Sequence, residues 1–254
     1  FVFSLVFLAV LCWLVLTALW EFYQLAKQRG LTPFTKLAGA CTLIYLVSNY
    51  LTLFSSKLNL LPYGVLGLSI FALFIRALCI KERPTDSIAI TLLGLIYVTL
   101  PLSLIFNINF KLGLGLGRWW LMYLIFVIKG ADMGAYFVGK LLGKHALAPR
   151  VSPNKTIEGF IGGVILVTVI SCILIYFSPQ SIPLWYQSWL FALMGGVSLA
   201  VLGQLSDLSE SMLKRDAHVK DSNKIRGFGG ILDMVDSMIF AIPLFYLFLL
   251  FGGL

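Results

Sequence analysis

The chain has 254 residues, of which 59% are hydrophobic and only 12% are charged, and its formal net charge is +8. Globular domains carry about 25% charged residues on average, so this composition excludes a soluble domain. A positive net charge can indicate nucleic-acid binding, but here the basic residues lie in loops between apolar runs. They are better explained as topology signals and as partners for anionic lipid or nucleotide phosphate, so we expect no nucleic-acid partner.

Apolar runs of about 20 residues recur from end to end, and each is long enough to cross a bilayer core of about 30 Å. The predicted fold class is therefore all-α, a polytopic integral membrane protein embedded in the lipid bilayer. We expect about eight transmembrane helices, at roughly 1–20, 38–55, 60–80, 87–107, 119–138, 158–178, 184–203 and 238–254. The sequence opens on Phe1 inside an apolar run, with no initiator Met, so we expect further residues upstream.

Charge divides the chain into two parts. Residues 1–128 are predicted to form N-terminal transmembrane helices, and residues 129–254 a C-terminal transmembrane catalytic region with two polar segments, 129–159 and 203–236. Basic residues concentrate in alternate loops, and the positive-inside rule places that set, including both polar segments, in the cytoplasm. We therefore expect one site that faces the cytoplasm from the cell's inner (plasma) membrane.

The segment 203–236 holds eleven charged residues between two apolar helices. Asp207 and Glu210 lie one helical turn apart, and Ser211 and Lys214 continue the same helical face. Asp233 and Asp236 are similarly spaced at the start of the last apolar run. A solvated helix end and a dipole-stabilised helix start would explain each pair alone.

Two carboxylate pairs on two helix ends are also what a magnesium site needs. Mg²⁺ takes hard oxygen ligands, usually one or two carboxylates with waters and substrate phosphates. We predict Mg²⁺ as cofactor, with a second cation left open. Five basic residues of the same segment are spaced to neutralise phosphate oxygens, namely Lys214, Arg215, Lys220, Lys224 and Arg226. This mixture suits metal-assisted phosphoryl or nucleotidyl transfer.

The segment 129–159 carries a second group of polar residues. Asp132 and Tyr136 share one face of the predicted fifth helix, and Lys129 lies three residues before Asp132. A carboxylate within an apolar helix is a functional candidate by default. The turn from Ser152 to Thr156 opens the next helix, where its hydroxyls and Lys155 could hold phosphate. Ordinary capping by Ser152 or Thr156 would explain the hydroxyls but not the lysine.

These motifs together resemble the phosphatidate cytidylyltransferase family, also called CDP-diacylglycerol synthase. The principal motif is Ser211-Met-Leu-Lys214-Arg215-x4-Lys220-Asp221-Ser222, followed by Gly229-Gly230-Ile-Leu-Asp233-x-x-Asp236-Ser237. Further matching blocks are Asp207-Leu-x-Glu210-Ser211, Asp132-x-x-Ala135-Tyr136-x-x-Gly139 and Ser152-Pro-x-Lys155-Thr156-x-Glu158-Gly159. The sequence departs from the family pattern at Phe228, where the family has His, and at Met234, where it has Arg.

The resemblance implies an enzyme of phospholipid biosynthesis that joins CTP and phosphatidic acid to give CDP-diacylglycerol and pyrophosphate, with Mg²⁺ required. It also implies one more N-terminal helix, while the oligomeric state, a homodimer included, stays open. The metal ligands would be Asp207 and Asp233, with Asp221 and Asp236 in support, and these four are predicted to be catalytic together with Lys214 and Lys220. The substrate-binding residues would be Asp132, Tyr136, Ser152, Lys155, Thr156, Ser211 and Arg215.

Two alternatives remain at this point. One is another CTP-dependent lipid enzyme, either a polyprenol kinase or an archaeol-type cytidylyltransferase. The other is a membrane transporter that uses the pair of Lys129 and Asp132, which would require carboxylates at the membrane midplane rather than at one face.

Overall fold

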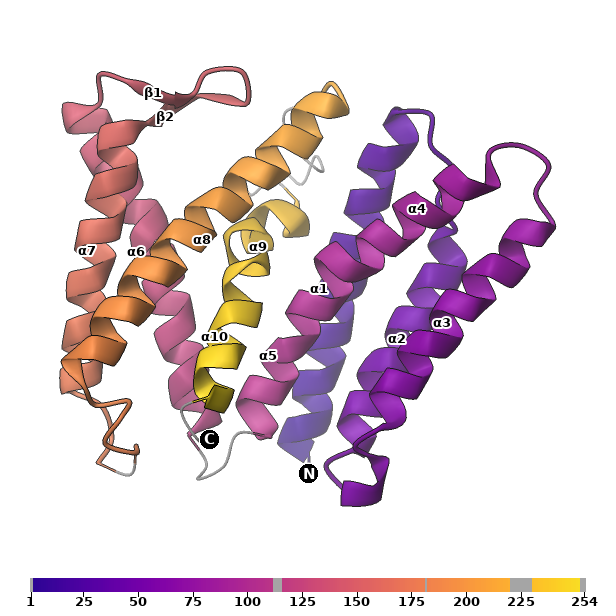
Figure 1. The fold of residues 1–254 in the computed structure, drawn as a ribbon, viewed down its shortest axis with the longest axis horizontal. Helices are drawn as coiled ribbons and strands as arrows, with labels where there is room; N and C mark the ends of the chain where they lie inside the picture. The colour runs from indigo at the N-terminus through magenta and orange to yellow at the C-terminus, as the bar shows by residue number, and fades with distance from the viewer. Residues whose placement is uncertain (1, 112–115, 181, 220–229, 252–254) are drawn as a thin grey trace. The chain divides into compact units, whose positions relative to one another are not determined.

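The protein is described by a computed structural model that covers residues 2–111, 116–180, 182–219 and 230–251 and is mostly helical (Figure 1). The elements in chain order are α1 (Val2–Gln28), α2 (Thr35–Leu51), η1 (Ser56–Leu58), α3 (Leu61–Leu78), α4 (Pro84–Gly94), η2 (Leu95–Thr99), α5 (Leu100–Phe110), α6 (Gly117–Leu142), β1 (Ala146–Ala148), β2 (Ser152–Thr156), α7 (Ile157–Tyr176), α8 (Trp189–Asp216), α9 (Ile231–Ile239) and α10 (Ala241–Phe251). They form two compact units: unit 1 comprises Phe1–Asn107 and Asp216–Met234, and unit 2 comprises Ile108–Arg215 and Val235–Leu254.

The predicted all-α membrane class is confirmed, but the predicted count of eight spans is too high. In the described residues, six helices are long and apolar enough to cross a membrane, and a seventh is added if α9 and α10 count as one bent span. The difference lies at α2, which has only 17 residues. At 1.5 Å per residue it is about 26 Å long, at the short limit for a spanning helix.

Two prolines explain the irregular helices. Pro101 has no N–H group and its ring meets the carbonyl four residues earlier, which lies within η2, a stretch of π-helix. The span Pro84–Phe110 absorbs this local disturbance and stays continuous. Pro243 acts in the same way on the carbonyl of Ile239, where α9 ends, and α10 continues at an angle of 41°.

In unit 1, α1 packs against α2, α4 and η2, and α2 packs against α3. Polar groups join these helices inside the apolar core. The Tyr23 hydroxyl donates to the Thr91 carbonyl oxygen at 2.8 Å, and the hydroxyls of Thr42 and Thr99 lie 3.0 Å apart. Interhelical hydrogen bonds of this kind stabilise membrane bundles, where water offers no competing partner.

In unit 2, glycines allow α6 and α7 to pack with their backbones nearly in contact. A Cβ atom added at Gly163 would lie 2.7 Å from the carbonyl oxygen of Ala131, and one at Gly134 would lie 3.2 Å from the Cα of Gly163. Small residues at such positions favour close helix pairs in membranes. The close packing of α6 on α7 fixes the positions of the polar residues at the ends of these two helices.

A short antiparallel β-hairpin connects α6 to α7, at the end of this helix pair (Figure 1). It was not predicted, because the sequence was interpreted as a polar turn. Strand β2 runs directly into α7, and the Thr156 hydroxyl accepts the Gly159 N–H at 3.1 Å as the N-cap of that helix. The same residue therefore ends the strand and starts the helix.

Candidate functional site

A cavity of about 520 Å³ lies in unit 2 where α6, the hairpin, α7 and α8 meet. Its lining is Asp132, Ala135, Tyr136, Gly139, Lys140, Leu147, Asn154, Lys155, Thr156, Gly159, Phe160, Gln204 and Asp207. Five predicted site residues therefore share one cavity, although they come from three separate stretches of sequence: Asp132, Tyr136, Lys155, Thr156 and Asp207.

An ion pair between β2 and α8 lies at the centre of this lining. The Lys155 ammonium donates to Oδ2 of Asp207, and the two side chains are 29% and 28% exposed. Ser211, one turn further along α8, has its hydroxyl 3.4 Å from Oδ1 of the same aspartate. Because the pair is only partly exposed, solvent screens it less than a surface ion pair.

A second group of charges joins α6 to α9. The Lys129 ammonium lies 3.4 Å from Oδ2 of Asp132 and donates to the Ser237 hydroxyl at 3.0 Å. Asp236, next to that serine, is buried, and its carboxyl interacts electrostatically with Asp132 and Asp207. Acidic groups from α6, α8 and α9 thus interact with one another, and Lys129 and Lys155 pair with two of them.

A serine holds α8 and α9 together at this point. The Ser206 hydroxyl donates to the backbone carbonyl oxygen of Asp236 and accepts the N–H of Phe240 at 3.3 Å. Ser206 is fully buried. It therefore fixes the backbone that carries Asp236 relative to the helix that carries Asp207.

The hairpin is held in place by residues at both of its ends. Glu158 accepts the backbone N–H groups of Lys144 and His145 at 3.1 and 3.2 Å, and its other oxygen lies 2.6 Å from Nδ1 of His145. Arg215, at the end of α8, donates through Nε to the carbonyl oxygen of Val151 at 3.2 Å. These contacts keep Lys155 and Thr156 at the cavity wall.

The remaining predicted residues lie elsewhere. Ser152 and Arg215 are not part of the cavity lining, and Lys214 pairs with the buried Glu210 of its own helix. Asp233 belongs to unit 1, where its Oδ2 accepts the Gly230 N–H at 2.8 Å. Lys220 and Asp221, together with Lys224, Arg226 and Phe228, lie outside the described residues.

Of the four predicted metal ligands, the structure describes Asp207, Asp233 and Asp236, whereas Asp221 lies outside the described residues. Over residues 2–111, 116–180, 182–219 and 230–251, no three carboxylate, imidazole or thiol groups gather closely enough to hold a metal ion by themselves. Asp207 and Asp236 are hard oxygen donors within reach of each other's charge in unit 2. Such a pair fits Mg²⁺, which completes its shell with waters and substrate phosphates rather than with a full protein cage.

The sequence matches the cytidylyltransferase family over residues 1–251. The chain belongs to this family. It is 31% identical to the phosphatidate cytidylyltransferase of Chlamydia pneumoniae over 98% of this chain and 83% of that protein. It is 36% identical to the phosphatidate cytidylyltransferase of Bacillus subtilis (strain 168) over 76% of this chain and 68% of that protein. The Staphylococcus haemolyticus protein of the same name is 42% identical over 53% of this chain and 50% of that protein.

Three polar residues of this cytidylyltransferase-family cavity were not among the predicted site residues: Lys140, Asn154 and Gln204. Gln204 lies one helical turn before Asp207 on α8, and its amide donates to the Phe160 carbonyl oxygen at 3.2 Å. Asn154 precedes Lys155 on β2 and lines the same cavity. The spacing of Gln204 from Asp207 was the available signal, since residues three apart share a helical face. No sequence signal indicated Asn154 as a lining residue, because the stretch around it was interpreted as a turn.

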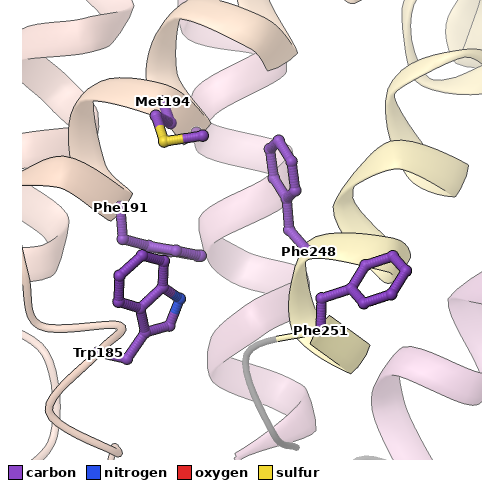
Figure 2. Close-up of a pocket in the computed structure, with 6 residues that line it drawn as sticks. Trp185, Phe191, Met194, Phe248 and Phe251 are labelled. Carbon is purple, nitrogen blue, oxygen red and sulfur yellow. The ribbon is translucent and has the colours of Figure 1, made fainter.

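A second cavity of unit 2 has a different chemistry. It measures about 300 Å³ and is lined by Trp185, Phe191, Met194, Gly195, Phe248 and Phe251, whose aromatic and thioether side chains surround it in Figure 2. This lining suits hydrocarbon and offers no group that would bind a phosphate. Within unit 2, the polar cavity is therefore the candidate site for the family's chemistry.

Proposed function

We propose that this protein transfers the cytidylyl group of CTP to phosphatidic acid, giving CDP-diacylglycerol and pyrophosphate for phospholipid biosynthesis. The observation that carries the proposal is the polar cavity, in which Asp132 and Asp207 stand with Lys140 and Lys155 in a chain built from membrane helices. Its family membership and the shared name of its relatives support the same reaction.

The cavity's lining suits an amphipathic phosphate. Lys155 and Lys140 can meet phosphate oxygens, while Ala135, Leu147 and Phe160 give the same cavity apolar walls. Tyr136 is 62% exposed, and the Lys140 ammonium lies 5.8 Å from the centre of its ring. A nucleotide base or a lipid glycerol can pack on such a ring while the lysine neutralises the adjoining phosphate.

We further propose that activity requires Mg²⁺, held by Asp207 and Asp236 with support from Asp233 and Asp221. Bound Mg²⁺ would supply charge neutralisation at phosphate oxygens. The carboxylates of Asp132, Asp207 and Asp236 repel one another unless a cation lies near. Lys129 supplies that charge to Asp132, and Lys155 supplies it to Asp207. A metal could take over this role at Asp207 and leave Lys155 for substrate phosphate.

The reaction then needs positioning rather than covalent catalysis. An oxygen of the phosphatidic acid phosphate attacks the α-phosphorus of CTP and forms the new P–O bond. The bond from that phosphorus to the oxygen bridging to the β-phosphate breaks, and the electron pair leaves with pyrophosphate. Lys155 and Lys140 would hold the phosphates in line and neutralise charge, which is the main protein contribution in such transfers.

We propose that the site lies on the cytoplasmic side of the cell's inner membrane. Lys and Arg concentrate in or beside the loops that follow α1 and α3 and in the loop between α6 and α7, and the positive-inside rule supports the cytoplasmic assignment. CTP is a charged nucleotide that meets the membrane from this side, while phosphatidic acid would enter from the adjacent leaflet.

The test uses purified protein in detergent with CTP, phosphatidic acid and Mg²⁺. Wild type should form CDP-diacylglycerol and release pyrophosphate, whereas a kinase would release CDP. Asp207→Asn should lose at least about 100-fold in rate, because it removes a charge at the reacting phosphates. Asp86→Asn is the matched control, since Asp86 pairs with Arg83 at the start of α4 in unit 1.

Two results would contradict the proposal. If wild type forms no CDP-diacylglycerol, the assigned reaction is wrong. If Asp207→Asn and Asp86→Asn both keep the wild-type rate, the reaction stands but the cavity is not its site.

A further inference from the structure

A buried carboxylate in the first helix is not used by the site described above. Glu21 of α1 is 0% exposed, although α1 is an apolar spanning helix. An acidic residue at such a position is costly and calls for a specific partner. No sequence motif indicated a role for Glu21.

Two backbone N–H groups that Glu21 accepts lie more than 200 residues away, in the first turn of α9. Its Oε1 accepts the Ile231 N–H at 3.1 Å, and its Oε2 accepts the Leu232 N–H at 2.8 Å. All three residues belong to unit 1. The first N–H groups of a helix have no partner within that helix, so an outside acceptor is needed when the turn is buried. Leu232 is fully buried, so water cannot replace the carboxylate there.

Asp233 takes the adjoining amide of the same turn. Its Oδ2 accepts the Gly230 N–H at 2.8 Å, so two carboxylates divide three successive amides between them. Glu21, on α1, accepts the N–H groups of Ile231 and Leu232. Asp233 accepts the third of these N–H groups, that of Gly230.

We propose that Glu21 is a positioning residue, which holds the first turn of α9 so that the Asp233 carboxylate is directed toward metal and phosphate. This inference rests on the proposed function, in which Asp233 supports metal binding. Without Glu21, the amides of Ile231 and Leu232 need another acceptor, and the carboxylate of the same turn is Asp233. The amides would then compete with the metal for this carboxylate.

Partners that orient a ligand carboxylate typically change metal affinity or activity by about 10- to 100-fold when removed. Glu21→Ala should therefore raise the Mg²⁺ concentration for half-maximal rate by about 10-fold or more. Glu21→Gln keeps the shape and one carbonyl acceptor but brings an NH₂ group against the second amide. Its shift should lie between wild type and Glu21→Ala.

Tyr23→Phe is the matched control. Tyr23 lies two residues further along α1, is also buried, and donates to the Thr91 carbonyl oxygen rather than to α9. The variant should lower the melting temperature in detergent and leave the Mg²⁺ requirement at the wild-type value. A merely structural role of Glu21 would make its variants behave in the same way as this control.

A second measurement does not depend on turnover. Hydrogen exchange of peptides covering 230–236, measured without substrate, should be faster in Glu21→Ala and Glu21→Gln than in wild type and Tyr23→Phe. The rise in melting temperature on adding Mg²⁺ alone should require higher Mg²⁺ in the Glu21 variants. If Glu21→Ala does not fold, the hydrogen exchange and the Mg²⁺-dependent melting temperature are both measured on Glu21→Gln instead.

The outcomes separate the two proposals. Wild-type exchange over 230–236 together with a wild-type Mg²⁺ requirement in the Glu21 variants would overturn the role of Glu21. Equal shifts in Tyr23→Phe would overturn it as well. If wild type makes no CDP-diacylglycerol, the proposed function fails, whereas the exchange and melting measurements still decide whether Glu21 holds α9 and affects the metal.

Discussion

Replacing Gly163 by alanine tests whether the close packing of α6 on α7 holds the site together. The added Cβ would lie 2.7 Å from the Ala131 carbonyl oxygen and 3.1 Å from the Ala135 backbone N. Ordinary contact begins at 3.4 Å, so the helices must separate by roughly 0.7 Å. Backbone atoms cannot turn aside in the way that a flexible side chain can.

The expected effects on stability and on rate differ in size. Overpacking costs about 1–3 kcal/mol, and the better helix propensity of alanine offsets about 1 kcal/mol, so the net loss of stability is about 0–2 kcal/mol. The rate should suffer more, because a displacement of about 1 Å at reacting groups costs about 100-fold. We expect Gly163→Ala to lose about 10- to 100-fold in CDP-diacylglycerol formation.

The assay compares the rate and the melting temperature of Gly163→Ala with those of Gly67→Ala in detergent. Gly67 is a glycine of α3 whose added Cβ would meet nothing within 4 Å. The control should keep its rate and melt at or above the wild-type temperature. Full activity in Gly163→Ala, with the same melting behaviour as the control, would refute the argument that α6–α7 packing sets the geometry of the cavity.

Three further predictions concern the cavity and its hairpin. Lys155→Ala should lower the rate at least about 100-fold with partial recovery in Lys155→Arg, and equal rates in both variants would exclude a charge role. Glu158→Gln should speed hydrogen exchange over residues 144–156, because the backbone N–H groups of Lys144 and His145 lose a charged acceptor; unchanged exchange would show that the hairpin is held by other contacts. Chelation by EDTA should abolish the rate and added Mg²⁺ should restore it, and activity that persists in EDTA would remove the metal from the proposal.

Local sequence patterns were sufficient where a residue's role depends on its own helix. The apolar runs predicted the helical membrane class, and helical spacing placed Asp132 and Tyr136 on one face, where both line the cavity. Thr156 was identified as a candidate cap and does cap α7. Charge density also led to Asp207, which pairs with Lys155 across the cavity.

Contacts between distant segments could not be predicted in this way. The Nε of Arg215 donates to the Val151 carbonyl oxygen, because the hairpin brings that carbonyl to the end of α8, while the predicted binding of substrate phosphate by Arg215 stays a prediction. Hairpin formation itself depends on pairing Ala146 with Thr156 and on the acceptor at Glu158, neither of which leaves a short-range pattern. The roles assigned to the metal ligands remain predictions.

The contact between Glu21 and α9 also bears on how the chain is made. Its partners lie 210 and 211 residues further along the sequence, so at about 5–20 residues per second a ribosome reaches them roughly 10–40 s after Glu21. Throughout that interval α1 carries a carboxylate without these two donors. A chain interrupted before α9 carries the Glu21 carboxylate in α1 without the N–H donors of Ile231 and Leu232, which should make incomplete products less stable in the bilayer than complete ones. A helix synthesised late in this chain thus supplies hydrogen-bond donors to one synthesised about 200 residues earlier.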